Sequence, residues 1–576
     1  MKKVRRCKLL TADISMYDKD ISPVGWYIGS YLLRFIEVEK EGDCDPEQRF
    51  LSWENTVLVK ADSMAEARSK IEQIARSETE PYQGGNGVLV QWLSEGITEL
   101  LPVYEELEDG AEIMWQPRGY TKLKNLRKLV IKKENFTHDK YVPRIRRGGI
   151  MSYTADFEKA LEVGRPPNIK ALFPNSRALI VSGKVIDRAM LMKGKAMTMA
   201  ANGRNHLVIR GALMAAQRAQ AALIIEIARS EGGASSYCAT NYWNMARQVD
   251  ALCNEMGITV PVAIHADHYG IKSPADIAFA RTEIPSLFDA GITSIAIDAS
   301  HMLDDENLLA SIALSSVIPA WAGYETEVGE IKGTAGLSSA AEALFLVQGL
   351  NAHDIFPDWI ALNNGTTHGI EASDAGIQVE LTGEIHAALE KYGVSGAQHG
   401  TSGNSSERLR AIASQTRTTK ANVATALQMI SWGVEVNDYG NAILDADGEF
   451  VKVPGQGMSE ELWDKMKAYA KDKGWSKGNY KNLNLAFENR IMGQPREIRE
   501  RMARRVSDFV FTMLTEVFNA QGTARHAVDA ILAAGCYDLG PKVGRMESPE
   551  EWTEEKIRAR AAELDTDKGP EGDFSD

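Results

Sequence analysis

From about residue 176 onward, short apolar segments alternate with amphipathic helical segments. This alternation predicts repeated strand–helix–strand units and a parallel sheet, because parallel strands need a long crossover that is usually a helix. We expect eight strands, at residues 195–202, 221–228, 260–267, 294–300, 323–329, 359–365, 396–400 and 433–437. Eight strands over roughly 260 residues match a (β/α)8 TIM barrel in number and size. An open doubly wound sheet is the alternative, but no GxGxxG motif follows the first strand.

Several of these apolar strands end in side chains that can bind a metal or transfer a proton. Barrel enzymes build their active sites at the carboxyl ends of the strands. Five of the ten histidines fall at such ends. The candidate residues at the strand ends are Asn202, Ser230, His265, Asp267, His268, Asp298, Ser300, His301, Glu327, His368, His399 and Asn437. This end of the predicted barrel is therefore the expected site.

Three of the histidines, His268, His368 and His399, come from separate loops. Three neutral imidazoles form a ligand set for a borderline-soft divalent ion, with zinc favoured and another divalent metal as the alternative. An aspartate that points across the pocket beside such an ion is suited to proton transfer, and Asp267 is the candidate. The turns after strands six to eight are rich in small residues, which let backbone N–H groups approach a bound anion.

With these residues in place, the stretch from about 176 to 520 resembles the class II, metal-dependent fructose-bisphosphate aldolases. The resemblance rests on six pieces in the family's order: SEGGAS at 230–235, VPVAIHADH at 260–268, IDASHMLDDEN at 297–307, ETEVG at 325–329, THG at 367–369 and HGTSG at 399–403. HADH alone would be weak evidence, but six ordered pieces on a barrel pattern are strong evidence.

The resemblance implies reversible retro-aldol cleavage of a ketose phosphate. The default substrate is fructose 1,6-bisphosphate, which gives dihydroxyacetone phosphate and glyceraldehyde 3-phosphate. It also implies that His268, His368 and His399 hold Zn²⁺, that Asp298 and Glu327 orient ligands or hold the metal in an alternative position, and that a monovalent cation can accompany it. Homo-oligomers, dimers or larger, are expected. The implied substrate-binding residues are Asn202, Ser230, Gly369, Gly400, Ser402 and Asn437.

The sequence also departs from the family pattern. Thr334 and Ala335 stand where the family often has a loop glutamate. Two positions where lysines help to hold phosphate in the family read Ile370-Glu371 and Glu435 here. Acids beside a phosphate dianion are unfavourable. Two alternatives therefore stay open: the same chemistry on a different or non-phosphorylated ketose, and a catalytically weakened barrel with a regulatory or assembly role.

The whole chain divides into four expected regions. Residues 1–130 should form a small α+β domain, which resembles a small bacterial domain of unknown function and brings no chemistry with it. Residues 131–175 are expected to be a connector, because GRPPN and a basic stretch interrupt regular structure. Residues 176–547 should form the barrel with a C-terminal insertion and helices. The acidic tail at 548–576 is expected to be partly disordered.

Charge and cysteine content exclude several function classes. The formal net charge of −14 argues against nucleic acid as a partner. The five scattered cysteines suggest neither a disulfide framework nor a zinc finger, which favours a reducing compartment. No apolar run approaches the roughly 18 residues of a membrane span. We therefore expect a cytoplasmic protein without a membrane partner, acting on a small sugar phosphate.

Overall fold

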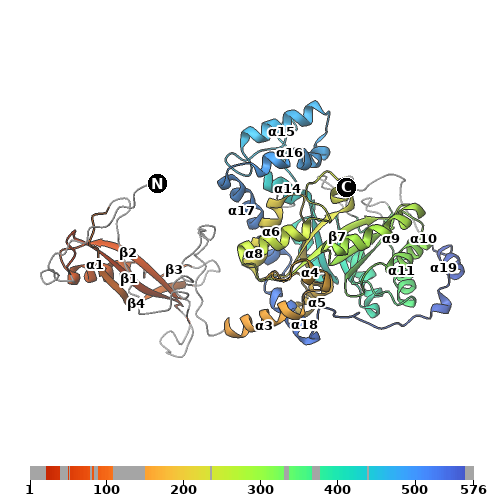
Figure 1. The fold of residues 1–576 in the computed structure, drawn as a ribbon, viewed down its shortest axis with the longest axis horizontal. Coiled ribbons are helices and arrows are strands. Elements are labelled where there is room, and N and C mark those ends of the chain that lie inside the picture. The colour runs from red at the N-terminus through yellow and green to blue at the C-terminus, as the bar shows by residue number, and fades with distance from the viewer. Residues whose placement is uncertain are drawn as a thin grey trace, which may run out of the picture. The chain divides into compact units, whose positions relative to one another are not determined.

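The chain folds as two compact units, Met1–Arg147 and Gly148–Asp576, each with its own hydrophobic core. The computed structural model describes residues 21–38, 50, 52–77, 79, 81–83, 89–107, 150–233, 236–329, 336–365, 376–437 and 440–564 (Figure 1). No helix in these ranges is both long and apolar enough to cross a bilayer.

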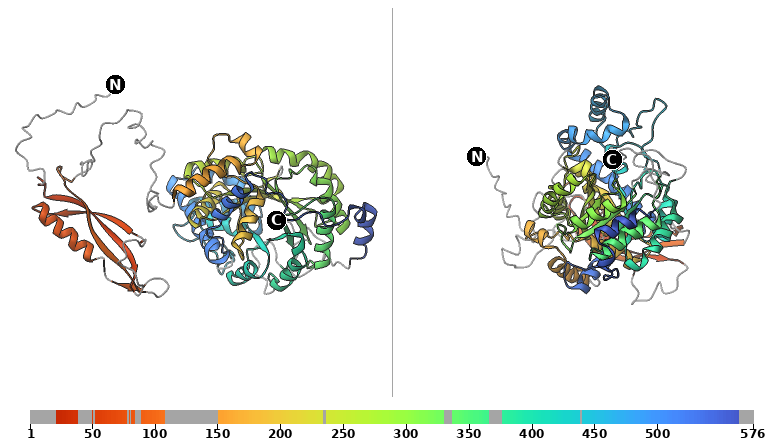
Figure 2. Two further views of the ribbon diagram at one scale, coloured as in Figure 1. Left: turned by 90° about the horizontal axis from the view of Figure 1, so that it is seen from below. Right: turned by 90° about the vertical axis from the view of Figure 1, so that its right-hand side faces the viewer.

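The first unit is an antiparallel sheet with the strand order β2-β1-β4-β3 and one helix along a face (Figure 2). On that face Tyr27, Tyr31 and Leu33 of β1 pack with Ile71 of α1. The predicted α+β domain is confirmed, and residues 108–130 of its expected span lie outside the described ranges. The elements are β1 (Trp26–Glu37), β2 (Ser52–Lys60), α1 (Met64–Ser77), β3 (Tyr82–Gln83) and β4 (Leu89–Pro102).

The second unit is a closed parallel barrel, which confirms the predicted (β/α)8 fold (Figure 1). The strand order around the barrel is β10-β11-β12-β5-β6-β7-β8-β9. The strands are almost wholly buried, as expected for a sheet covered by helices. They are β5 (Thr198–Asn202), β6 (Leu223–Ala228), β7 (Val262–Gly270), β8 (Ser294–Asp298), β9 (Gly323–Val328), β10 (Trp359–Leu362), β11 (Ser395–Gln398) and β12 (Thr418–Val423).

The helices surround the barrel and extend beyond it (Figures 1 and 2). Those between the first and last strands are α6 (His206–Ala219), α7 (Arg229–Gly232), α8 (Met245–Met256), α9 (Pro274–Asp289), α10 (Asp304–Ser315), α11 (Ala340–Ala352), α12 (Val379–Ala388) and α13 (Ser406–Gln415). Those outside this span are α3 (Ile150–Val163), α4 (Pro167–Leu172), α5 (Gly183–Lys193), α14 (Thr425–Trp432), α15 (Glu460–Asp472), α16 (Leu483–Met492), α17 (Arg496–Thr512), α18 (Thr523–Ala534) and α19 (Glu554–Ala561).

The eighth strand is not where the sequence pattern put it. Residues 433–437 lie outside the barrel, where Val434 and Val436 form isolated bridges with Lys452 and Ala442. The barrel is closed instead by β12, which reads TTKANV and pairs with β11 and β5. Its polar residues hide the strand from a search for apolar runs. Lys420 is nevertheless fully buried, because it pairs with carboxylates from other strands. The prediction for strand eight was therefore wrong by about fifteen residues.

Two further segments contain helices that were not predicted from the sequence. The predicted connector contains α3 and α4, and Phe157, Ala160 and Leu161 of α3 belong to the barrel unit's core. The tail that was expected to be partly disordered contains α19, whose Ile557 is buried beside Trp552 in a core cluster. Apolar residues at helical spacing pack both segments against the core. They were overlooked because glycines, prolines and charged residues make up most of the surrounding sequence.

Candidate active site

An irregularity in β7 brings two neighbouring residues to the same cleft. Side chains of consecutive strand residues normally point to opposite faces. Here the pairing of β7 with β8 shifts register between Ala266 and Tyr269, and His268 has a φ of 42°. Asp267 and His268 consequently both line the cleft, with Asp267 Oδ2 4.0 Å from His268 Nε2.

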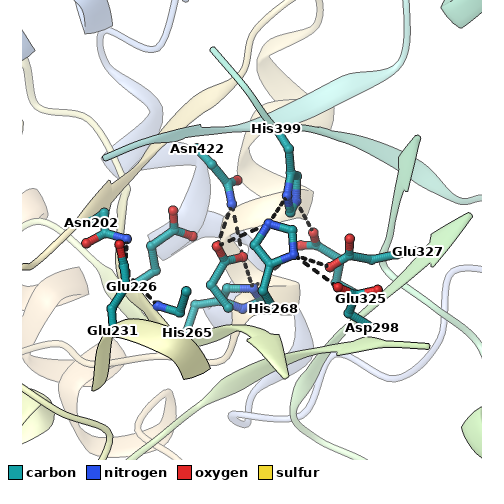
Figure 3. Close-up of polar contacts among 12 residues, drawn as sticks. Asn202, Glu226, Glu231, His265, His268, Asp298, Glu325, Glu327, His399 and Asn422 are labelled. Atoms are coloured by element: carbon teal, nitrogen blue, oxygen red, sulfur yellow. Dashed lines mark hydrogen bonds and ion pairs between the residues drawn. The ribbon is translucent and has the colours of Figure 1, made fainter. Parts of the chain in front are cut away.

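The rings of His268 and His399 converge at the mouth of the barrel (Figure 3). His268 Nε2 lies 2.5 Å from His399 Nδ1. The opposite nitrogens face acids: His399 Nε2 is 2.8 Å from Glu325 Oε1, and His268 Nδ1 is 3.1 Å from Glu327 Oε1 and 3.4 Å from Asp298 Oδ2. Carboxylates in these positions hold imidazole tautomers so that the other nitrogen presents its lone pair. At this separation the two facing nitrogens share a proton, and the same pair of nitrogens is placed to bind a cation instead.

The donor set around these rings fits a divalent metal. Ligand atoms of Asp267, His268 and His399 lie within 4.8 Å of one another, as do those of His268, Asp298 and Glu327. Glu327 Oε1 is buried and, apart from its ion pair with His268 Nδ1, has no hydrogen-bond partner in the described part of the chain. Burial lowers the pKa of His268, but Glu327 and Asp267 outweigh it and hold this pKa well above its usual range. The site thus favours positive charge. The third predicted histidine, His368, lies outside the described residues.

Below the two histidines, a buried lysine balances several acids. Lys420 Nζ lies 2.8 Å from Glu325 Oε2, 3.2 Å from Asp267 Oδ1 and 3.4 Å from Glu226 Oε2. It also lies 3.1 Å from His265 Nε2. Burial alone would raise the pKa of Asp267, but Lys420 and His268 hold it well below its usual range. Asp267 is therefore ionised and able to accept a proton.

Asp267 is held in place from the eighth strand. Asn422 Nδ2 donates hydrogen bonds to both oxygens of Asp267, at 2.9 and 3.0 Å. These bonds fix the carboxylate plane beside the histidines, which is a requirement for directed proton transfer. The cleft above has about 470 Å³ of empty space, including the part that is open to solvent. Its lining residues are Asn202, Glu226, Ala228, Asp267, His268, His399, Gly400, Thr401, Ser402, Asn422, Ala424 and Thr425.

The predicted substrate-binding residues do not all reach this cleft. Asn202, Gly400 and Ser402 line it. Ser230 is exposed on α7 and is not among the lining residues. Asn437 belongs to the loop after α14, where its backbone N–H donates to Asn441 O, and it does not line the cleft either. Gly369 lies outside the described residues.

The sequence analysis missed Lys420, Asn422, Glu226 and Glu325 as site residues. Lys420 and Asn422 were missed because strand eight was misplaced. Glu435 was therefore compared with the family lysine that precedes the strand-eight asparagine. In the structure that asparagine is Asn422, and Lys420 stands two residues before it. Correct placement of TTKANV would have revealed both residues. Glu226 is the single acid of the apolar strand β6, and Glu325 lies with Glu327 in the fully buried strand β9; an acid inside a buried strand is itself a signal of a buried polar network.

Comparison with known proteins gives two family matches. A model described as fructose-bisphosphate aldolase class-II matches residues 184–474, and a model described as a domain of unknown function (DUF4288) matches residues 26–115. The fructose-bisphosphate aldolase of Streptococcus pneumoniae serotype 4 is 29% identical over 221 residues, which cover 38% of this chain and 69% of that protein. The fructose-bisphosphate aldolase of Mycoplasma pneumoniae is 27% identical over 205 residues, which cover 35% of this chain and 65% of that protein.

Solved structures give more distant matches. The YdjI aldolase of Escherichia coli K12 is 18% identical with a TM-score of 0.41, covering 60% of this chain and 99% of that chain. The fructose-bisphosphate aldolase of Campylobacter jejuni is 17% identical with a TM-score of 0.41, covering 60% of this chain and 97% of that chain.

Proposed function

Since this chain belongs to the class II fructose-bisphosphate aldolase family, which its residues 184–474 match, we propose that it is a metal-dependent aldolase. It would cleave a ketose phosphate reversibly, with fructose 1,6-bisphosphate as the first substrate to test. The observation that carries the proposal is the convergence of His268 and His399 next to an ionised Asp267. Metal ligands and a proton acceptor beside one cleft are what a retro-aldol reaction requires.

The residues that would hold the ion are His268, His399 and, from the sequence motif, His368. Zn²⁺ is the first choice for a histidine-rich set with an open position. Glu327 and Asp298 lie on the other side of His268 and could hold the ion in an alternative position. When bound, such an ion would polarise a substrate carbonyl and stabilise the charge that develops on its oxygen.

Asp267 would perform the proton transfer. The carbon–carbon bond breaks when the hydroxyl on the neighbouring carbon loses its proton and becomes the aldehyde carbonyl. Asp267 accepts that proton, while the electron pair of the broken bond stays with the ketone fragment. Asn422 holds the carboxylate in position, and Lys420 keeps it ionised until the proton arrives. In the condensation direction the same carboxyl returns the proton.

The reading as a catalytically weakened barrel is disfavoured by this arrangement. A barrel kept only for binding has no need of a buried lysine that holds an aspartate ionised beside two converging histidines. The alternative of a different ketose has more support, because none of the described residues that line the cleft is a lysine or arginine.

The test is cleavage of fructose 1,6-bisphosphate by the purified full-length protein, measured as made, with chelator, and with zinc restored. We expect activity that the chelator abolishes and zinc restores. A protein that retains zinc but cleaves neither this substrate nor other ketose 1-phosphates would contradict the aldolase proposal. A protein with full activity in chelator would contradict the metal.

A further inference from the structure

Three buried acceptor oxygens in the cleft have no hydrogen-bond partner within the described ranges. They are Asn202 Oδ1, Glu226 Oε2 and Asn422 Oδ1. The residues Asn202 and Glu226 are 3% and 1% exposed, and all three residues line the cleft. They stand on β5, β6 and β12, which are neighbours in the barrel. Buried polar atoms are normally paired, so a group of three unpaired acceptors points to a ligand.

The remaining polar atoms of these side chains fix their orientation. Asn202 Nδ2 donates to Glu231, and Asn422 Nδ2 donates to Asp267. Glu226 Oε2 forms an ion pair with Lys420 at 3.4 Å but no hydrogen bond. Neither amide can rotate to offer its NH₂ group to the cleft without breaking a buried bond. The cleft therefore presents acceptors here, and its ligand must bring donors.

The position of these acceptors assigns them to one half of the substrate. Figure 3 shows Asn202 and Glu226 on one side of His268, with Glu327 and Asp298 on the opposite side. This step rests on the proposed function: the ketone oxygen belongs at the histidine side, and Asp267 acts on the hydroxyl across the breaking bond. Groups beyond Asp267, on the side away from the metal ligands, consequently face the fragment that leaves as the aldehyde.

The donor is a hydroxyl rather than a charged group. A phosphate dianion carries acceptors only and would lie beside Asp267 with no cationic side chain among the described lining residues. An ammonium group would be placed close to the buried Lys420. A neutral hydroxyl satisfies the acceptors without adding charge to the site.

We propose that Glu226 determines specificity by accepting a hydrogen bond from the hydroxyl next to the aldehyde carbonyl. The enzyme then selects 2-hydroxyaldehydes and rejects aldehydes that lack this hydroxyl. Burial and Asp267 raise the pKa of Glu226 well above its usual range, and a carboxyl group accepts such a bond through its carbonyl oxygen when protonated. Asn202, beside it, supports the same fragment.

The experiment varies one hydroxyl on the substrate and one acceptor on the protein. Zinc-loaded full-length enzyme condenses dihydroxyacetone phosphate with lactaldehyde or with propanal, which differ only in the 2-hydroxyl. We expect the wild type to prefer lactaldehyde in kcat/KM by about 10- to 100-fold. In Glu226→Met the ratio should fall to within about threefold of unity, whereas Glu226→Gln, which keeps a carbonyl acceptor, should retain most of it. Because propanal undergoes the same bond formation, the ratio separates recognition from a general loss of rate.

Each outcome decides the proposal. A wild type without preference, or a Glu226→Met variant that keeps the full preference, overturns it and leaves the aldolase assignment standing. If Glu226→Met does not fold, Glu226→Leu, which also lacks an acceptor, replaces it, and an unchanged ratio there overturns the proposal equally. If the zinc-loaded wild type turns over no aldehyde and cleaves no ketose phosphate, the proposed function itself fails and this inference falls with it.

Discussion

Lys420 Nζ lies 2.8 Å from Glu325 Oε2, and both side chains are completely buried inside the barrel. Asp267 and Glu226 complete a group in which one ammonium faces three carboxyl groups. Removing charges from water is costly, and the attraction between them offsets that cost only while every partner is present. The interior of the barrel at this level is therefore held by charge balance as well as by apolar packing.

Replacing Lys420 with Met should destabilise the barrel by roughly 3–5 kcal/mol, because it leaves carboxyl groups buried without a counter-charge. Denaturant unfolding followed by the tryptophans of the barrel measures the loss. Lys465→Met on the exposed face of α15 is the matched control and should have little effect. The double variant with Glu325→Gln should recover part of the stability. An unchanged unfolding midpoint in Lys420→Met would disprove the charge-balance account.

His268→Ala and His399→Ala should each lose bound metal, since their facing ring nitrogens form the convergent pair. Metal analysis of the purified proteins is expected to show roughly one zinc per chain in the wild type and little in either variant. His206→Gln, on α6 and hydrogen-bonded to Gln248, is the control histidine and should keep its metal. Full occupancy in both alanine variants would refute the ligand assignment.

Asp267→Asn should keep the metal but lose cleavage by about 1000-fold, because the amide cannot accept the proton that the carboxylate takes. Steady-state cleavage combined with metal analysis separates the two properties. Asn422→Ala should reduce kcat less, since it only frees the orientation of Asp267. Near-normal turnover of Asp267→Asn would exclude it from proton transfer.

The free energy of unfolding of the barrel unit should decrease as the pH rises from 4.5 to about 7, because of Glu488 on α16. Burial raises the pKa of this carboxyl from 4.5 to about 7, and its Oε2 has no partner among the described residues. Between these values the unfolded chain has released the proton while the folded chain keeps it, so rising pH favours unfolding, and above about 7 the loss is complete.

Glu488→Gln should remove this dependence. The free energy of unfolding of this variant should match that of the wild type near pH 4.5. At pH 8 it should be higher by roughly 2 kcal/mol, because there the wild type must bury a charge. Unfolding curves at the two pH values measure the difference, and Asp472→Asn at the exposed end of α15 serves as the control. Equal pH profiles for Glu488→Gln and the wild type would show that Glu488 titrates normally.

Hydrophobic patterning was enough to predict the barrel because most of the strands are largely apolar and buried on both faces. It failed at β12, whose Lys420 and Asn422 point into the site and remove the apolar signature. The same limit hid α3 and α19. Their buried residues are few, and flanking turn residues outweigh them in composition.

The candidate site was partly predictable for a related reason. Asp267, His268 and His399 stand directly after or within recognisable motifs, so sequence order alone placed them together. Partners such as Glu325 and Glu226 lie inside the barrel wall, and only the closure of the sheet brings them to Lys420. Contacts between strands that are distant in sequence have no local signal.

The left-handed backbone at His268 has a consequence for how such a barrel can change over time. A side chain at this φ costs roughly 1–2 kcal/mol relative to an unstrained residue, whereas glycine adopts it freely. His268→Gly should therefore be sturdier than His268→Ala, although both have lost the imidazole. Replacement of His268 by glycine would relieve the backbone strain but would remove the imidazole that the site needs. Selection for catalytic activity is therefore what keeps histidine at this position. A glycine at the position of His268 in a homologous barrel would accordingly indicate a protein that no longer catalyses this reaction.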